Sequence, residues 1–201
     1  QTFDLLRTTL LASPSFVMGK LESALSFILL LLLAAIPLQS LAFLFGGVSQ
    51  AEVGVAFVIL AVTAVTLGTI GLFFSAVSPR TLSASIQTYT VSLVGAFAVP
   101  LLLGLIFRLV AEVINPSTAL IEGLFVYLQQ IFTSLNPVAT ALQTQTLLVE
   151  RQVIGFTSVT LNSTGGQVPV VSPWISFTII YLMISALLLV MTVGRMRRVE
   201  D

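Results

Sequence analysis

The chain has 201 residues, of which 57% are hydrophobic and only 8% are charged, and its formal net charge is zero. A soluble domain carries about 25% charged residues, so this composition excludes a water-soluble fold and indicates an integral membrane protein. The balanced charge argues against a nucleic-acid partner. The absence of Cys and His removes the usual zinc, haem and iron–sulfur ligands, so we expect no metal site and no Cys or His catalysis.

Residues 1–14 predict a short amphipathic helix. Phe3, Leu6 and Leu10 recur at helical spacing, and Thr and charged side chains fill the other face. The Ser13-Pro14 step ends this helix, because proline restricts the residue before it. Ser15 is expected to cap the next helix. This segment either binds a soluble partner or is only a surface helix at the membrane interface.

Four uncharged or nearly uncharged runs predict membrane-spanning helices, since a span needs about 20 apolar residues. These runs cover residues 23–46, 53–78, 82–112 and 173–194. A signal peptide is the rival interpretation of the first run, but that run exceeds the ~7–15 apolar residues of a signal core, and further spans follow. Pro37 predicts a kink in the first span. Small residues in the second span, including Gly68 and Gly71, favour close helix packing within this chain over a dimer seam.

The third span is interrupted by Gly95, Pro100 and Gly104. Such residues are tolerated in a span when neighbouring groups satisfy the freed backbone. They produce either a simple kink or a moving helix that lines a pathway, so these three residues are the candidate hinge. Arg108 and Glu112 lie four residues apart, near the point where the helix leaves the membrane, and could pair.

Residues 115–172 are too polar for a span and too apolar for a free loop. A helical stripe from Leu120 to Leu135 predicts an amphipathic helix, which Asn136-Pro137 ends, and a weaker helix follows from Val138 to Glu150. We expect these helices to lie at the interface or to cap the bundle, with a buried re-entrant segment as the alternative. The following residues, rich in Thr, Ser and Gly, predict an irregular loop.

Four spans place both ends of the chain on one side of the membrane. If that side is cytoplasmic, six basic residues lie inside and two lie outside, which obeys the positive-inside rule. The inside set is Arg7, Lys20, Arg80, Arg195, Arg197 and Arg198, and the outside set is Arg108 and Arg151. No span carries an ionisable residue at mid-depth, and the chain has no phosphate-binding loop. If the protein moves a solute, the energy must come from another subunit or from residues beyond this sequence.

The N-terminal segment QTFDLLRTTLLASPSFVMGKL resembles the corresponding segment of ABC-2 type transporter permeases, the membrane subunits of ATP-binding-cassette exporters. That family pattern has a Thr and an acidic residue before Leu-Leu, a Ser-Pro-like break, and Gly-Lys-Leu before a span. The matching residues are Thr2, Asp4, Leu5, Leu6, Ser13, Pro14, Gly19, Lys20 and Leu21. The family's acidic-basic lead is missing. The order of spans, turns, outer helices and basic tail is also similar over the whole chain.

The resemblance implies an all-α, polytopic bundle forming one permease domain over residues 1–201. This chain would hold spans three to six of a six-span permease and would be a fragment lacking the first two spans. The implied coupling helix, which docks on the ATPase, consists of Thr2, Phe3, Asp4, Leu5, Leu6 and Arg7. The implied partners are an ATP-binding-cassette ATPase, a second permease copy or paralogue, and the lipid bilayer.

The chain itself would then be no enzyme and would hold no cofactor, because ATP and Mg would bind in the partner ATPase. The implied location is a bacterial inner membrane, with both ends cytoplasmic. A non-transporting membrane scaffold is the alternative function. An intramembrane enzyme is disfavoured, because the spans lack His, Cys, Asp and Glu at depth. Polar residues in the spans that could line a pathway are Gln39, Ser40, Gln87, Tyr89 and Ser92.

Overall fold

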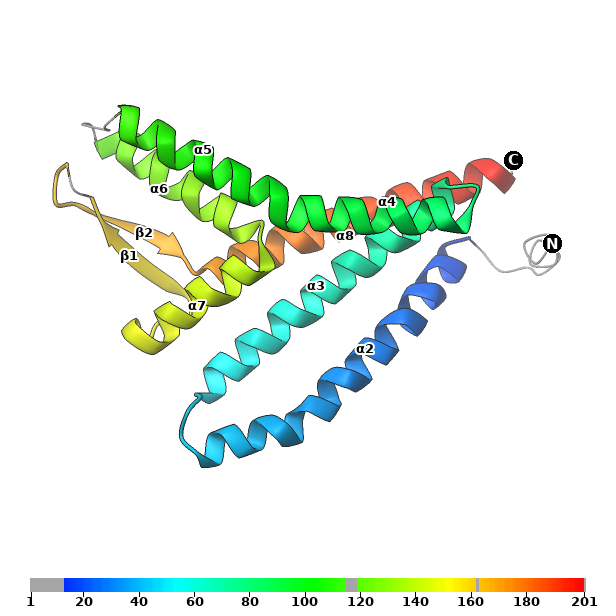
Figure 1. Cartoon of the computed structure of the whole chain (residues 1–201), viewed down its shortest axis with the longest axis horizontal. Helices are drawn as coiled ribbons and strands as arrows, with labels where there is room; N and C mark the ends of the chain where they lie inside the picture. Colours follow the sequence, from blue (N-terminus) through cyan, green and yellow to red (C-terminus); the bar gives the residue numbers. More distant parts are fainter. Residues whose placement is uncertain (1–12, 115–118, 162, 201) are drawn as a thin grey trace.

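The computed structural model describes residues 13–114, 119–161 and 163–200, and it shows a helical bundle with one small hairpin (Figure 1). The elements in order are α2 (Ser13–Leu44), α3 (Gln50–Val77), α4 (Thr81–Leu93), the π-helix η1 (Val94–Ala98), α5 (Val99–Ile114), α6 (Ala119–Ser134), α7 (Pro137–Arg151), β1 (Phe156–Thr160), β2 (Gln167–Val171) and α8 (Pro173–Glu200).

Four helical stretches in the described part are long and apolar enough to cross a membrane: Pro14–Ala42, Gln50–Val77, Thr81–Glu112 and Pro173–Met196. Each overlaps one of the four predicted spans. The chain is therefore a multi-pass, all-α membrane protein, as its sequence predicts. The third span is α4, η1 and α5 in one continuous run.

The first span starts earlier than its apolar core. The described part of α2 begins at Ser13, and both Pro14 and Ser15 are helical residues within it. The prediction that Ser15 caps this helix is therefore wrong. Pro37 lies inside α2, whose axis changes direction toward its C-terminal end (Figure 1). The hydroxyl of Ser40 donates to the Pro37 carbonyl at 2.6 Å.

The core of the bundle lies between α3 and α8. Val55, Ile59 and Val62 of α3 pack with Phe177 and Tyr181 of α8, and the side chain of Phe177 has no exposed surface. Deeper in the same interface, the hydroxyl groups of Thr66 and Ser185 are hydrogen-bonded at 2.9 Å. The Thr66 hydroxyl also donates to the Tyr181 carbonyl of α8 at 3.3 Å. Apolar packing and these buried polar contacts of Thr66 therefore hold the two spans together.

The small residues of α3 let its neighbours approach. A Cβ at Gly68 would lie 3.3 Å from Leu21 Cδ1 of α2, and a Cβ at Gly71 would lie 3.7 Å from Thr88 Cγ2 of α4. Both glycines therefore face helices of the same chain. This confirms the prediction of packing within the chain.

The predicted irregular loop after α7 is wrong, because its residues form an antiparallel hairpin. Strands β1 and β2 pair from Phe156–Val171 to Thr160–Gln167. The turn is closed by the N–H of Leu161, which donates to the Gly166 carbonyl, and by Gly165, whose φ of +69° favours glycine.

The hairpin and the two predicted outer helices gather at one end of the bundle, which we call the hairpin end (Figure 1). Helices α6 and α7 are the predicted amphipathic helices, and Asn136 caps α7 by accepting from the N–H groups of Val138 and Ala139. The Tyr127 hydroxyl of α6 donates to the Pro169 carbonyl of β2 at 2.9 Å. At the opposite, terminal end lie the starts of α2 and α4 and the end of α8 (Figure 1).

Candidate functional site

The π-helix η1 interrupts the α-helical winding of the third span at its middle, and we call this interruption the break of the span. There the N–H of Val99 donates to the carbonyl of Val94, five residues back. Pro100 follows directly. Proline has no N–H, and in an α-helix its ring collides with the carbonyl four residues back, so a wider turn relieves the conflict. Gly95 lies within η1 and carries no side chain to resist the change in winding. The break is thus fixed by sequence and divides the span into two arms.

A cavity of about 600 Å³, which we call the hinge cavity, opens beside α5, the C-terminal arm of the third span. Helix α5 provides one wall, and α6 with the start of α7 provides the other. Its lining residues are Pro100, Leu101, Gly104, Phe107, Arg108, Ala111, Gln129, Phe132, Thr133, Asn136 and Ala139. The two walls are held together by aromatic packing. The centroid of the Phe107 ring lies 4.7 Å from that of Phe125 and 5.5 Å from that of Phe132.

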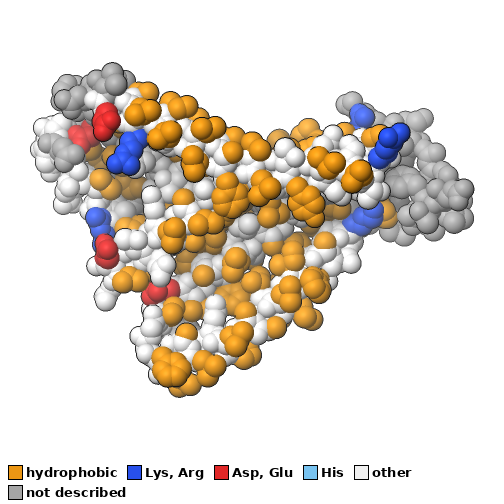
Figure 2. Space-filling view, in the orientation of Figure 1, with side chains coloured by type: hydrophobic (Ala, Val, Ile, Leu, Met, Phe, Trp, Pro, Cys, Tyr) orange, Lys and Arg blue, Asp and Glu red, His pale blue; other side chains and the backbone are white. Residues whose placement is uncertain are grey.

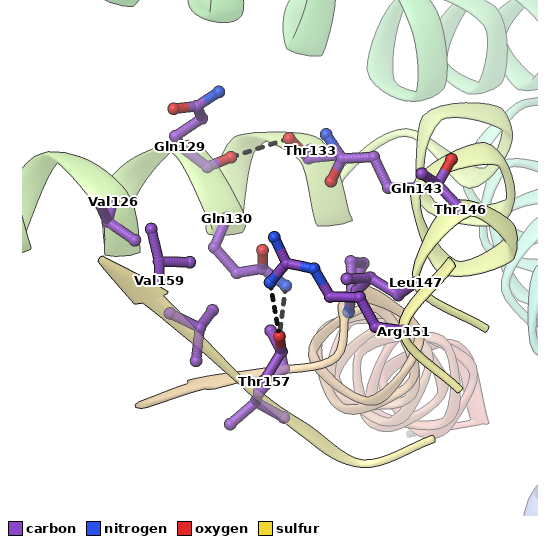
Figure 3. Close-up of a pocket in the computed structure, with 13 residues that line it drawn as sticks. Val126, Gln129, Gln130, Thr133, Gln143, Thr146, Leu147, Arg151, Thr157 and Val159 are labelled. Atoms are coloured by element: carbon purple, nitrogen blue, oxygen red, sulfur yellow. Dashed lines mark hydrogen bonds between the residues drawn. The ribbon is translucent and has the colours of Figure 1, made fainter. Parts of the chain in front are cut away.

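A second cavity of about 340 Å³, the hairpin cavity, lies between α6, α7 and the two strands (Figure 3). Figure 3 shows Gln130 and Arg151 extending toward each other from α6 and α7. One guanidinium nitrogen of Arg151 donates to the Thr157 hydroxyl at 3.1 Å and to the Ser158 carbonyl at 3.3 Å. The Gln130 amide donates to the Val171 carbonyl at 2.9 Å. These bonds tie the hairpin to both helices.

Gln129 and Thr133 line both cavities, so the two hollows adjoin across one face of α6. The Thr133 hydroxyl is already used, because it donates to the Gln129 carbonyl of its own helix. Gln129 and Thr133 therefore form a polar border that the two cavities share.

Charge is arranged unevenly around these cavities. On the face shown in Figure 2, acidic side chains gather at the hairpin end. The described acidic residues there are Glu52, Glu112, Glu122 and Glu150, and none of them lines either cavity. The two described cations at this end each line a cavity: Arg108 lines the hinge cavity, and Arg151 lines the hairpin cavity.

The predicted site residues fall into two groups. The proposed coupling residues 2–7 lie outside the described residues. Of the three hinge candidates, Pro100 and Gly104 line the hinge cavity, and Gly95 lies within η1. The predicted pairing of Arg108 with Glu112 is wrong, as no ion pair joins them in the described part of the chain.

Sequence reasoning missed the cavity-lining roles of Arg108, Gln129 and Asn136. In the sequence, Gln129 lies opposite the apolar stripe of its helix, and this polar position is the signal that could have pointed to it. Among the suggested pathway-lining residues, Gln87 instead accepts from the Ser78 hydroxyl at 2.6 Å, beside the turn between α3 and α4.

Within the described residues, no three or more Asp, Glu, His or Cys side chains gather as a metal site would require. Comparisons with protein-family models, curated proteins and solved structures find no match for this chain.

Proposed function

We propose that this chain is the membrane-spanning permease subunit of an ATP-binding-cassette exporter. It would move a substrate across the membrane with energy from ATP hydrolysed by a separate nucleotide-binding subunit. The observation that supports this proposal most is the broken third span, whose π-turn and Pro100 adjoin the hinge cavity. A span that is divided into two arms beside a hollow suits a protein that switches between two shapes. The resemblance of the N-terminal segment to ABC-2 type permeases supports an ATP-binding-cassette ATPase as the energy source.

The packing contacts offer a mechanical route from the N-terminal segment to the hinge. A push on residues 2–7 by the ATPase would be passed along the chain to α2, whose described residues begin at Ser13. Leu21 of α2 lies against Gly68, and Gly71 lies against Thr88 of α4. Displacement of α2 would thus reach α4, whose C-terminal end runs into η1. ATP binding would bias the bundle toward one of its two shapes, and ATP hydrolysis would reset it.

The proposed orientation places both chain ends in the cytoplasm of a bacterial cell, with the hairpin end outside. The terminal end carries Lys20, Arg80 and Arg195 among the described side chains, and the only described carboxylate nearby is Glu22. This distribution supports the positive-inside assignment. In this proposal the second permease half, a copy or paralogue, completes the translocation pathway.

Co-purification tests the proposal. We would purify the full-length protein from native membranes as wild type and as the double variant Asp4→Arg with Leu6→Glu, and score each for a bound ATPase. We expect the wild type to retain the ATPase and the variant to lose it, because docking into a groove needs the mixed polar and apolar face. A matched control is Glu150→Arg with Leu142→Glu. It makes the same chemical changes at exposed sites of α7 on the hairpin end, and it should keep the ATPase.

A non-transporting membrane scaffold is the alternative. It would bind its partners through its spans and would need no ATPase. If wild-type protein brings down no ATPase, or if the control variant loses it as fully as the coupling variant, the scaffold becomes the better explanation.

A further inference from the structure

We propose that the hinge cavity binds a membrane amphiphile with an anionic headgroup, such as a phosphatidylglycerol, with Arg108 holding the headgroup. This inference concerns binding alone and does not depend on the proposed transport function. It rests on the depth of the cavity in the membrane, on its polarity along that depth, and on the charge of its lining.

The depth of Arg108 in the membrane follows from helix geometry. Arg80 and Arg108 lie at the two ends of the third span, 28 residues apart, which at 1.5 Å per residue is about 42 Å. A bilayer including its headgroup layers is about 40–45 Å thick. On α8, Trp174 and Arg195 are separated by about 32 Å on the same scale, close to the hydrocarbon thickness. Arg108 therefore lies at the headgroup level of the hairpin-end leaflet.

The cavity extends from that level into the hydrocarbon. Pro100 lies eight residues below Arg108 on the same helix, or about 12 Å deeper. Leu101 and Gly104 line the wall between these depths. Leu101 is 66% exposed, so the cavity opens on the side that α5 presents to lipid. An acyl chain could enter there without crossing water.

The side chains still able to bind a headgroup are Arg108, at the shallow end, and Gln129, on the facing wall of the cavity. Deeper in the cavity, the side-chain oxygen of Asn136 already caps α7 and the Thr133 hydroxyl bonds to its own helix. Within the described residues, the side chains of Arg108 and Gln129 make no hydrogen bond. No carboxylate lines the cavity, so nothing there would repel a phosphate, and a guanidinium binds phosphate through two parallel N–H donors.

Binding can be measured on the purified chain in non-ionic detergent. Phosphatidylglycerol, phosphatidylcholine and water-soluble glycerol phosphate would be titrated separately, with bound molecules counted by native mass spectrometry. We expect one saturable site that prefers phosphatidylglycerol over phosphatidylcholine by about five-fold or more, the order of magnitude for one basic residue facing an anionic headgroup. Arg108→Gln should abolish the preference, and Arg108→Lys should keep part of it.

Two matched controls separate this cavity from general lipid contact. Arg80→Gln removes a cation at the other end of the same span that lines neither cavity, and the preference should remain. Gly104→Leu places a side chain where a Cβ meets nothing within 4 Å, so it should fold and should weaken binding of both lipids by filling the cavity. Gly54→Leu on α3, which is equally unobstructed, should not weaken binding.

Three results would overturn the proposal. If Arg80→Gln and Arg108→Gln reduced the preference for phosphatidylglycerol equally, the preference would come from general attraction of anionic lipid to basic residues at the membrane surface. Full competition by glycerol phosphate would show a site for a soluble anion. Unchanged lipid binding in Gly104→Leu would place the lipid elsewhere.

Discussion

The hydroxyl pair between α3 and α8 permits a quantitative test of how these spans are joined. The Ser185 hydroxyl lies 2.9 Å from that of Thr66, and both side chains are nearly fully buried, at 3% and 2% exposure. Each hydroxyl also has a carbonyl partner on its own helix, Val62 for Thr66 and Tyr181 for Ser185, and the Thr66 hydroxyl lies 3.3 Å from the Tyr181 carbonyl of α8 as well. Removing either hydroxyl therefore leaves the other one satisfied.

The expected loss of stability is small, because each remaining hydroxyl keeps a hydrogen-bond partner. A truncation that orphans a buried polar group costs about 1–3 kcal/mol, and this cost is avoided here. The coupling between the two residues should equal one hydrogen bond between membrane helices, about 0.6 kcal/mol and at most about 1.7 kcal/mol. We expect Thr66→Val and Ser185→Ala each to destabilise the protein by about 1 kcal/mol, and the double variant to lose less than the sum.

The assay is a double-mutant cycle, with unfolding in mixed micelles followed by circular dichroism as denaturing detergent is added. The control is Thr63→Val, because the Thr63 hydroxyl bonds only to the Ile59 carbonyl of its own helix at 2.7 Å. It should change the free energy of unfolding by less than about 0.5 kcal/mol. Strictly additive losses from Thr66→Val and Ser185→Ala would refute the bond between these two hydroxyls.

Three further substitutions probe packing and the hinge. Gly68→Leu should destabilise the protein by about 1–3 kcal/mol by forcing α2 from α3; in the same unfolding assay Gly54→Leu should be close to neutral, and equal losses would count against close packing at Gly68. Phe177→Ala should cost about 3 kcal/mol or more by leaving a void at a side chain with no exposed surface, and a loss below about 1 kcal/mol would contradict the assigned core. Pro100→Ala restores an N–H beside η1 and should straighten the third span; spin labels at cysteines introduced on its two arms would then report a longer distance, and an unchanged distance would show that proline does not set the break.

The spans could be predicted because their signal is local. Long apolar runs, ended by turn residues and charge, determine where helices cross a bilayer. The same local rules located the boundary between α6 and α7 at Asn136-Pro137, where a cap and a first-turn proline coincide. A further local signal was overlooked, since Ser49 and Glu52 form the capping box that begins α3.

The hairpin and the cavities could not be predicted because their contacts are not local. Strand β1 reads FTSVT, whose Phe, Thr and Val favour a strand but extend over only five residues, and Pro169 weakens the pattern of β2. The hairpin is held by Tyr127, Gln130 and Arg151, which belong to other elements. The hinge cavity needs Arg108 and Gln129 on opposite walls, and only the folding of α6 back along α5 brings them together.

ATP hydrolysis by the partner subunit is the most direct test of the proposed transport mechanism. The ATPase that co-purifies with wild type would be added at equal amounts to proteoliposomes of each chain, and turnover would be compared between wild type, the coupling variant Asp4→Arg with Leu6→Glu, and the matched α7 control. If residues 2–7 transmit force between the ATPase and the bundle, wild type and control should hydrolyse ATP at similar rates, and the coupling variant should fall at least several-fold. Equal turnover in all three, with each chain inserted, would contradict a coupling role for this segment.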